Sequence, residues 1–168
     1  MKQDLGYVPQ DVFLFSDTIG NNIAFGQVDA DEDQVRQAAQ DAGVRGDIEG
    51  FEHGFDTMLG ERGVNLSGGQ KQRISIARAL VKSPRVLFLD DCLSAVDTET
   101  EDAILSAIEK QEAACTLMVS HRLASLRNAD RILVMDEGEI VESGTPDELL
   151  AAGGLYATMF EQQKAEQD

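Results

Sequence analysis

An unbroken apolar run bounded by charged residues is the feature that most restricts the fold of this chain. Residues 86–89 are all apolar; Arg85 precedes them, and Asp90 and Asp91 follow. Such a run is typical of a strand buried on both faces of a parallel sheet, and open α/β sheets bind ligands at the carboxyl ends of their strands. The run therefore predicts an α/β fold with two carboxylates at the ligand-binding edge.

These two carboxylates suit metal and proton chemistry. One of them can hold Mg²⁺ through water while the next handles a proton or orients a water molecule. A second apolar run, at residues 116–120, is predicted to bring His121 to the same edge. Asp90, Asp91 and His121 are therefore predicted to converge, although each alone is more often a helix cap, a turn acid or a solvated histidine.

A Ser-Gly-Gly sequence before a helical pattern predicts a socket for an anion. Ser67, Gly68 and Gly69 stand where the first N–H groups of a helix have no intrahelical partner and where the helix dipole is positive. The alternative is an ordinary N-cap. In that interpretation the helix simply places an apolar stripe on its inner face, at Ile74, Ala77 and Val81.

Five motifs, taken in order, make the chain similar to the ATP-binding cassette (ABC) ATPases. Gln10 resembles the Q-loop of that family, and His121 resembles its switch histidine. Residues 86–90 match its Walker B strand, and residues 94–97 match its D-loop. The signature motif is matched by five consecutive residues, Leu66, Ser67, Gly68, Gly69 and Gln70.

The resemblance covers nearly all 168 residues and implies an α/β fold. The expected architecture is a partial P-loop NTPase-like core sheet with helices plus an α-helical subdomain. Residues 1–168 would form a single partial ATP-binding domain. Its helical subdomain, with the signature, would occupy about 11–81, and the Walker B and switch-histidine core, with C-terminal helices, about 83–168.

The resemblance also assigns roles to individual residues, with ATP and Mg²⁺ as the cofactors. Gln10 and Asp90 would hold Mg²⁺ and water, Asp91 would be the general base, and His121 would contact the γ-phosphate. The remaining nucleotide-binding residues would be those of the signature and the last residue of the D-loop, namely Leu66, Ser67, Gly68, Gly69, Gln70 and Asp97.

Two segments are similar to those of the exporter branch, residues 13–19 and 60–63. This similarity implies two partners, the transmembrane domain of an exporter and a second nucleotide-binding domain, and a place at the cytoplasmic face of the cell membrane. Family members usually carry Glu where this chain has Asp91. The shorter side chain withdraws the carboxylate by about 1.5 Å. It is typical of the subunit with the weaker site in heterodimeric exporters, although Asp is also a competent base.

The phosphate-binding Walker A motif is absent from the sequence. That motif requires a Lys after a Gly, and none of the lysines here follows a glycine: Lys2, Lys71, Lys82, Lys110 and Lys164. The resemblance therefore predicts a chain truncated before the Q-loop, unable to hold ATP alone. It also predicts a sheet that lacks the Walker A strand beside residues 86–89.

Composition limits the other function classes. A formal net charge of -17 opposes binding to nucleic acid, and the apolar runs fall short of the ~20 residues that cross a bilayer. Cys92 and Cys115 are predicted to be buried thiols. Two alternatives remain open: a truncated remnant without a role, and a chromosome-maintenance or DNA-repair ATPase, which also uses a Leu-Ser-Gly-Gly signature. The second is disfavoured by the short step from Gln70 to Asp90 and by the absence of heptads.

Local signals predict the remaining elements. Residues 31–43 and 97–111 read as amphipathic helices, the second capped by Thr98 or Thr100 with Ala103 facing inward. Residues 131–135 and 139–142 read as a hairpin. Pro146 opens a short helix, and a final helix is predicted at residues 156–163.

Overall fold

The computed structural model describes residues 4–27, 29–60, 65–111 and 115–165 and divides the chain into two compact units, residues 1–119 and 120–168. The sequence pattern instead predicts a division by secondary-structure content, into a helical subdomain at about residues 11–81 and a core at about residues 83–168. That division stays a prediction. The first unit contains, in chain order, β1 (Leu5–Val8), α1 (Ile19–Ala24), α2 (Glu32–Asp41), α3 (Arg45–Glu49), the 3₁₀ helix η1 (Gly54–Asp56), α4 (Gly68–Leu80), β2 (Val86–Asp90), α5 (Thr98–Lys110) and β3 (Cys115–Val119).

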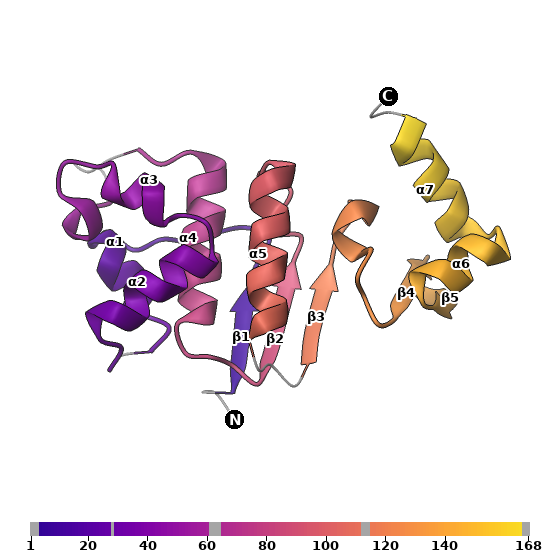
Figure 1. Ribbon diagram of the computed structural model, residues 1–168, viewed down its shortest axis with the longest axis horizontal. Helices are drawn as coiled ribbons and strands as arrows, with labels where there is room; N and C mark the ends of the chain where they lie inside the picture. The colour runs from indigo at the N-terminus through magenta and orange to yellow at the C-terminus, as the bar shows by residue number, and fades with distance from the viewer. Residues whose placement is uncertain (1–3, 28, 61–64, 112–114, 166–168) are drawn as a thin grey trace. The chain divides into compact units, whose positions relative to one another are not determined.

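The three strands of the first unit form a parallel sheet in the order β1-β2-β3 (Figure 1). Leu5 pairs with Val86, and Asp90 pairs with Val119. Strand β2 is therefore central, with a partner on each edge. The prediction that a strand is missing directly beside residues 86–89 is wrong, because β1 and β3 occupy both positions.

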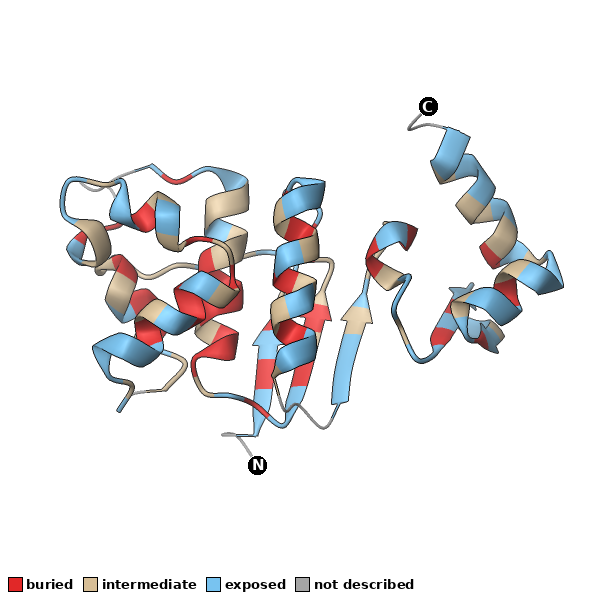
Figure 2. Cartoon of the chain, viewed as in Figure 1, coloured by how far each residue is buried: buried red, intermediate tan, exposed pale blue. Residues whose placement is uncertain are grey.

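Burial alternates along β2, which corrects the prediction of a strand buried on both faces. Leu87 and Leu89 are each 1% exposed, whereas Val86 is 38% exposed. The inward side chains join one core cluster with residues of α4 and α5. The opposite sheet face carries the stacked rings of Tyr7 and Phe88, 5.3 Å apart, and other exposed apolar side chains, namely Leu5, Val86, Leu117 and Val119. Figure 2 shows β3 almost entirely as exposed.

The helices between β1 and β2 form a helical region that packs against the sheet through α4. Helix α2 begins after Asp31, whose carboxylate accepts the N–H of Gln34 in a capping box. Its apolar stripe, with Val35 and Ala39, is buried as predicted. Gly43 follows the helix with φ of +65°, a conformation that glycine adopts at little cost.

Helix α5 differs from its prediction at two points. Its N-cap is Asp97, which accepts the N–H of Thr100 at 3.0 Å, so neither predicted threonine is the cap. Ala103 is exposed, and the inward positions are those of Glu101, Ile104 and Ile108. Cys115, at the start of β3, is exposed and not buried as predicted, whereas Cys92 is buried.

The second unit contains the 3₁₀ helix η2 (Leu123–Leu126), the hairpin of β4 (Ile132–Asp136) and β5 (Glu139–Gly144), and the helices α6 (Pro146–Ala152) and α7 (Leu155–Ala165). The predicted hairpin is confirmed, with a register shift at residues 134 and 135. Tyr156 of α7 is 2% exposed in a separate apolar cluster with Leu123. Within the described ranges, no helix of either unit combines the length and apolar character that crossing a membrane requires.

Candidate functional site

The predicted anion socket is the first turn of α4. Ser67 is its N-cap: the Ser67 Oγ accepts the Gln70 N–H at 3.2 Å, and the Gln70 Oε1 accepts the Ser67 N–H at 3.0 Å. The N–H groups of Gly68 and Gly69 lie in the first turn and have no intrahelical acceptor. Since the Ser67 Oγ serves as an acceptor in the box, its own proton can be donated outward. Leu66 is buried, whereas Ser67 and Gly68 are exposed.

An ionic brace holds this turn from the side of α3. Asp47 accepts the Gln70 Nε2 at 3.0 Å through one oxygen and an Arg73 N–H at 2.8 Å through the other. The same guanidinium donates to the carbonyl of Gly43 and, at 3.3 Å, to the carbonyl of Gly69. The Arg73 side chain is only 15% exposed. The brace therefore fixes the Gln70 amide, which in turn fixes the backbone of Ser67.

The two acidic residues lie at the carboxyl end of β2, as predicted. Asp90 is its last residue, and Asp91 follows with φ of +44°, in the left-handed region. Asp tolerates that region better than most residues do. The Asp91 N–H donates to the Val119 carbonyl at 2.9 Å, so the ends of β2 and β3 meet.

Gln10 shares this sheet edge, because it stands two residues after β1, which runs parallel to β2. The Gln10 amide and the Asp90 carboxylate supply oxygen donors of the kind that Mg²⁺ prefers. The described residues contain no cluster of three or more His, Cys, Asp or Glu side chains that could hold a metal. This donor set fits Mg²⁺ that keeps several waters and substrate oxygens as ligands.

Asp97 has a structural role of its own as the N-cap of α5. The pKa of the Asp97 carboxyl lies below its ordinary value, and the largest cause is the hydrogen bond from the Thr100 N–H. The carboxylate is therefore already committed to the helix start. A part in nucleotide binding stays a prediction for this residue.

His121 belongs to the second unit, where an amide clamp holds its backbone. The Gln163 Nε2 donates to the His121 carbonyl at 2.5 Å, and the Gln163 Oε1 accepts the Leu123 N–H at 2.9 Å. Helix α7 thus fixes the segment that contains the predicted switch histidine. The predicted convergence of His121 with Asp90 and Asp91 stays a prediction, because the two units are described separately.

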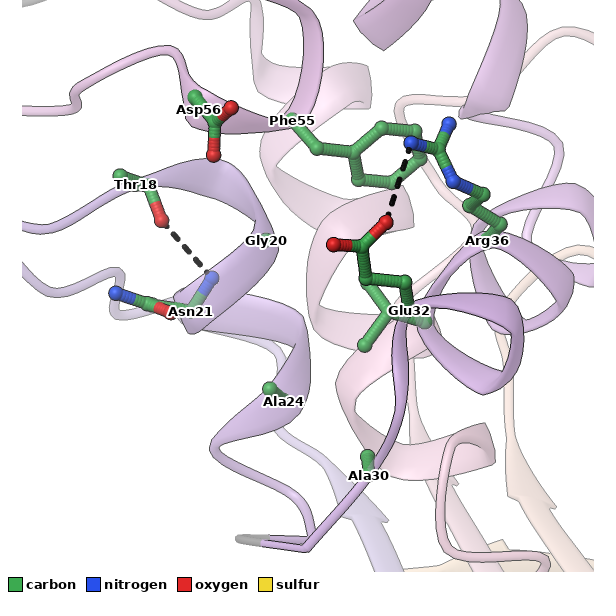
Figure 3. A pocket seen from close by; sticks show the side chains of 10 residues that line it. Thr18, Gly20, Asn21, Ala24, Ala30, Glu32, Arg36, Phe55 and Asp56 are labelled. Atoms are coloured by element: carbon green, nitrogen blue, oxygen red, sulfur yellow. Dashed lines mark hydrogen bonds and ion pairs between the residues drawn. The ribbon is translucent and has the colours of Figure 1, made fainter.

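A cavity of about 250 Å³ lies between α1, α2 and η1 of the first unit (Figure 3). Arg36 lies over the Phe55 ring, 5.0 Å from its centroid, and forms an ion pair of 3.8 Å with Glu32. None of the predicted site residues lines this cavity. The exporter-like segment at residues 60–63 is described only at Gly60; its other positions lie outside the described residues.

Sequence reasoning missed the residues that support the socket. Asp47, Arg73 and Ala95 contact its first turn, and Gln72 accepts the N–H of Ala95. The spacing of Gly69, Gln72 and Arg73 by three and four positions was a usable signal, because such residues neighbour each other on a helix. Asp47 and Ala95 gave no such signal, since each lies more than twenty positions from its partner in the chain.

The chain matches the family model described as ABC transporter over residues 1–94. ATP-binding cassette sub-family B member 6 of Xenopus tropicalis is 48% identical over 166 residues, which cover 98% of this chain and 20% of that protein. The probable multidrug resistance ABC transporter ATP-binding/permease protein YheI of Bacillus subtilis (strain 168) is 51% identical over 161 residues, 95% of this chain and 28% of YheI. A solved bacterial Atm1-family ABC exporter with ATP bound matches with a TM-score of 0.89 and 45% identity, over 96% of this chain and 29% of that one.

The fold and these matches define an ABC-type nucleotide-binding domain, and the chain belongs to the ABC transporter family. It corresponds to part of the nucleotide-binding domain of the family's exporters, and the predicted α/β fold is confirmed. The chain spans only 20–29% of the length of these relatives.

Proposed function

We propose that this chain carries the signature and the hydrolytic residues of an ABC exporter in which ATP binding and hydrolysis drive transport. The start of α4 carries the proposal. There, the Ser67 hydroxyl and the N–H groups of Gly68 and Gly69 form a braced set of donors on an exposed surface. Such donors stabilise negative charge on a phosphate. The match to an exporter with ATP bound, over 96% of the chain, supports the same assignment.

The signature residues and the hydrolytic residues of this chain belong to two different ATP sites. The signature turn faces the γ-phosphate of an ATP held by a second nucleotide-binding domain. Gln10 and Asp90 orient Mg²⁺ and water, Asp91 takes the proton of the attacking water, and His121 contacts the γ-phosphate of the subunit's own ATP. MgATP supplies the phosphoanhydride bond whose hydrolysis drives the cycle. The partners are the transmembrane domain and the second nucleotide-binding domain, at the cytoplasmic face of the cell membrane.

The isolated chain is expected to bind no ATP, because it contains only part of this composite site. Calorimetry with MgATP on the purified chain tests this, and we expect no heat of binding at ordinary micromolar-to-millimolar nucleotide. A Mg²⁺-dependent site with sub-millimolar affinity would contradict the division of donors between two subunits.

A chimera tests the activity itself. The 161 matching residues of YheI can be replaced by those of this chain, because the two are 51% identical there. We expect the chimera with Asp91→Glu, which restores the usual base, to hydrolyse ATP, and Ser67→Arg in this background to abolish most of the activity, since oxyanion-type donors are worth about 10²–10³ in rate. The control, Ser106→Arg, changes an exposed residue of α5. A membrane-inserted chimera without ATPase activity would overturn the proposal.

Asp91 distinguishes two arrangements of the complete transporter. If this subunit supplies the weaker base of a heterodimer, Asp91→Asn lowers total ATP hydrolysis only modestly, whereas Ser67→Arg damages the partner's working site. We propose the heterodimer, because Asp91 is one methylene shorter than the usual Glu, and a misplacement of about 1 Å can cost about 10²-fold in rate. Steady-state hydrolysis of the two variants with the partner subunit decides; equal and severe losses indicate that Asp91 is a working base.

A further inference from the structure

The two glycines of the signature have different surroundings. A Cβ added to Gly68 meets nothing within 4 Å, whereas a Cβ added to Gly69 lies 2.8 Å from the carbonyl oxygen of Ala95. Real Cβ atoms essentially never lie so close to a backbone oxygen. The absent side chain at Gly68 therefore leaves the outer face of the socket open. Because Gly69 also has no side chain, the turn of residues 94–97, which resembles a D-loop, can pack on α4.

A hydrogen bond reinforces this contact at the same residue. The Ala95 N–H donates to the Gln72 Oε1 at 3.2 Å. Gly69 and Gln72 are three positions apart on α4 and so lie on one side of the helix. Both polar groups of the Ala95 peptide backbone, its carbonyl and its N–H, thus face the first turns of the signature helix.

The other end of the turn is tied to the hydrolytic edge of the sheet. The Ser94 Oγ donates to the carbonyl of Asp91 at 3.2 Å, and the Val96 N–H donates to the carbonyl of Leu93 at 3.1 Å. The turn then continues into Asp97, the N-cap of α5. A contiguous set of contacts therefore runs from Asp91 through Ser94 and Ala95 to the signature turn of the same chain.

We propose that Gly69 and Gln72 form a clamp on Ala95 that makes the turn of residues 94–97 and the signature socket one mechanical element. In this arrangement Gln72 is a positioning residue, which acts through the backbone of Ala95. The clamp is a property of the chain alone. Its meaning for catalysis rests on the proposed function: it would transmit a displacement of Asp91, at one ATP site, to the signature that serves the other.

Two matched pairs of variants test the clamp in the full 168-residue chain without nucleotide, by NMR measurement of hydrogen exchange at the Ala95 amide. Gln72→Glu keeps an acceptor oxygen, whereas Gln72→Met keeps the length of the side chain and removes the acceptor. We expect Gln72→Met to speed exchange at Ala95 about fivefold to tenfold, the factor that suits one ordinary hydrogen bond. Gln72→Glu should stay within about twofold of the original rate, which a purely steric role for Gln72 does not predict.

The glycine pair tests the packing contact independently. Gly69→Ala should shift the amide resonances of residues 94–96 and speed exchange at Ala95, whereas Gly68→Ala should leave both unchanged. The Val35 amide reports on folding of the first unit, because it donates to the Asp31 carbonyl at 3.1 Å in α2. Equal exchange at Ala95 in Gln72→Met and Gln72→Glu, or equal resonance shifts in the two glycine variants, would overturn the clamp. Because no ATP is present, either outcome is independent of the proposed function.

Discussion

Cys92 lies in the turn after β2, where it is 2% exposed, and burial raises the pKa of its thiol to about 12. The thiolate is the reactive form of cysteine, so Cys92 should resist alkylation near neutral pH. Cys115 is exposed at the start of β3. We expect a maleimide at pH 7.5 to label one thiol in the native chain and both thiols in guanidinium. The Cys115→Ser variant should remain unlabelled while folded; rapid native labelling of that variant would contradict the burial of Cys92.

Asp97 should make the start of α5 sensitive to acid. Its folded pKa lies below the ordinary value of 3.8, because its carboxylate accepts the Thr100 N–H. The stabilisation is therefore fully present above the ordinary value and is lost as pH falls through the folded pKa. We expect Asp97→Asn to lower the free energy of unfolding at pH 6 and to differ less from the original chain at pH 3. Urea unfolding at the two pH values measures this, and a difference that is independent of pH would count against the charged cap.

The candidate site could be predicted from sequence only where its determinants are local. Ser67 and Gln70 lie three positions apart, so their capping box follows from the order of residues. The oxygen donors at the ends of β1 and β2 also follow, because parallel strands end at a common edge. The contacts of Asp47 and Ala95 with the signature turn depend on tertiary packing, which the sequence pattern does not specify.

At the scale of elements, the guanidinium of Arg78 adds polar contacts between α4 and the segment around α1, whose apolar residues already share one core. Arg78 donates to the Asn22 carbonyl at 2.7 Å and to the Phe13 carbonyl at 2.9 Å, and it lies 5.4 Å from the centroid of the Phe15 ring. Burial lowers the pKa of Arg78 from its ordinary value, although arginine side chains in proteins stay charged. The side chain thus connects two helices and the segment that follows β1.

Replacing this guanidinium should destabilise the helical region. An ammonium cannot reproduce the planar fork of donors, so Arg78→Lys should lower the free energy of unfolding by about 1–3 kcal/mol, the cost of leaving buried acceptors unpaired. Arg45→Lys is the matched control, because Arg45 forms an exposed ion pair with Glu49 on α3, worth under about 1 kcal/mol. Chemical denaturation measures both; equal losses would show that the Arg78 hydrogen bonds contribute little.

Elements with their own start or stop signals were predicted well, and those that depend on neighbours were not. Thr145, Pro146 and Glu148 specify the start of α6 within four residues, and the structure shows the complete capping box. The alternating burial along β2 could not be predicted, because an apolar run alone does not specify which face of the sheet a helix covers. Nor could the order of the strands, since the two neighbours of β2 lie far from it in the chain.

At the scale of the whole molecule, two properties oppose each other. The chain has a formal net charge of -17, which keeps copies apart by repulsion. Leu117 and Val119 meanwhile contribute exposed apolar area to the open sheet face, at 53% and 48% exposure, and such area favours association. Salt screens the repulsion but leaves the apolar attraction in place.

We therefore expect light scattering of the purified chain to rise with NaCl concentration between 20 mM and 500 mM, a range in which the Debye length falls to a few ångströms. Leu117→Lys should shift this rise to higher salt. Ser106→Lys adds the same positive charge at an exposed position of α5; because this charge lowers the net negative charge and so the repulsion, it should not shift the rise to higher salt. An equal shift in both variants would assign the effect to net charge alone.

The amide clamp of Gln163 has a practical consequence for anyone who shortens or tags this polypeptide. One carboxamide near the end of α7 holds the backbone on both sides of Arg122, so the first and last segments of the second unit are fastened to each other. A stop codon placed before this glutamine would remove both of these hydrogen bonds from the histidine-bearing segment at the opposite end of the unit, more than forty codons upstream. A purification handle is therefore better joined to the amino terminus, where it leaves this fastening undisturbed.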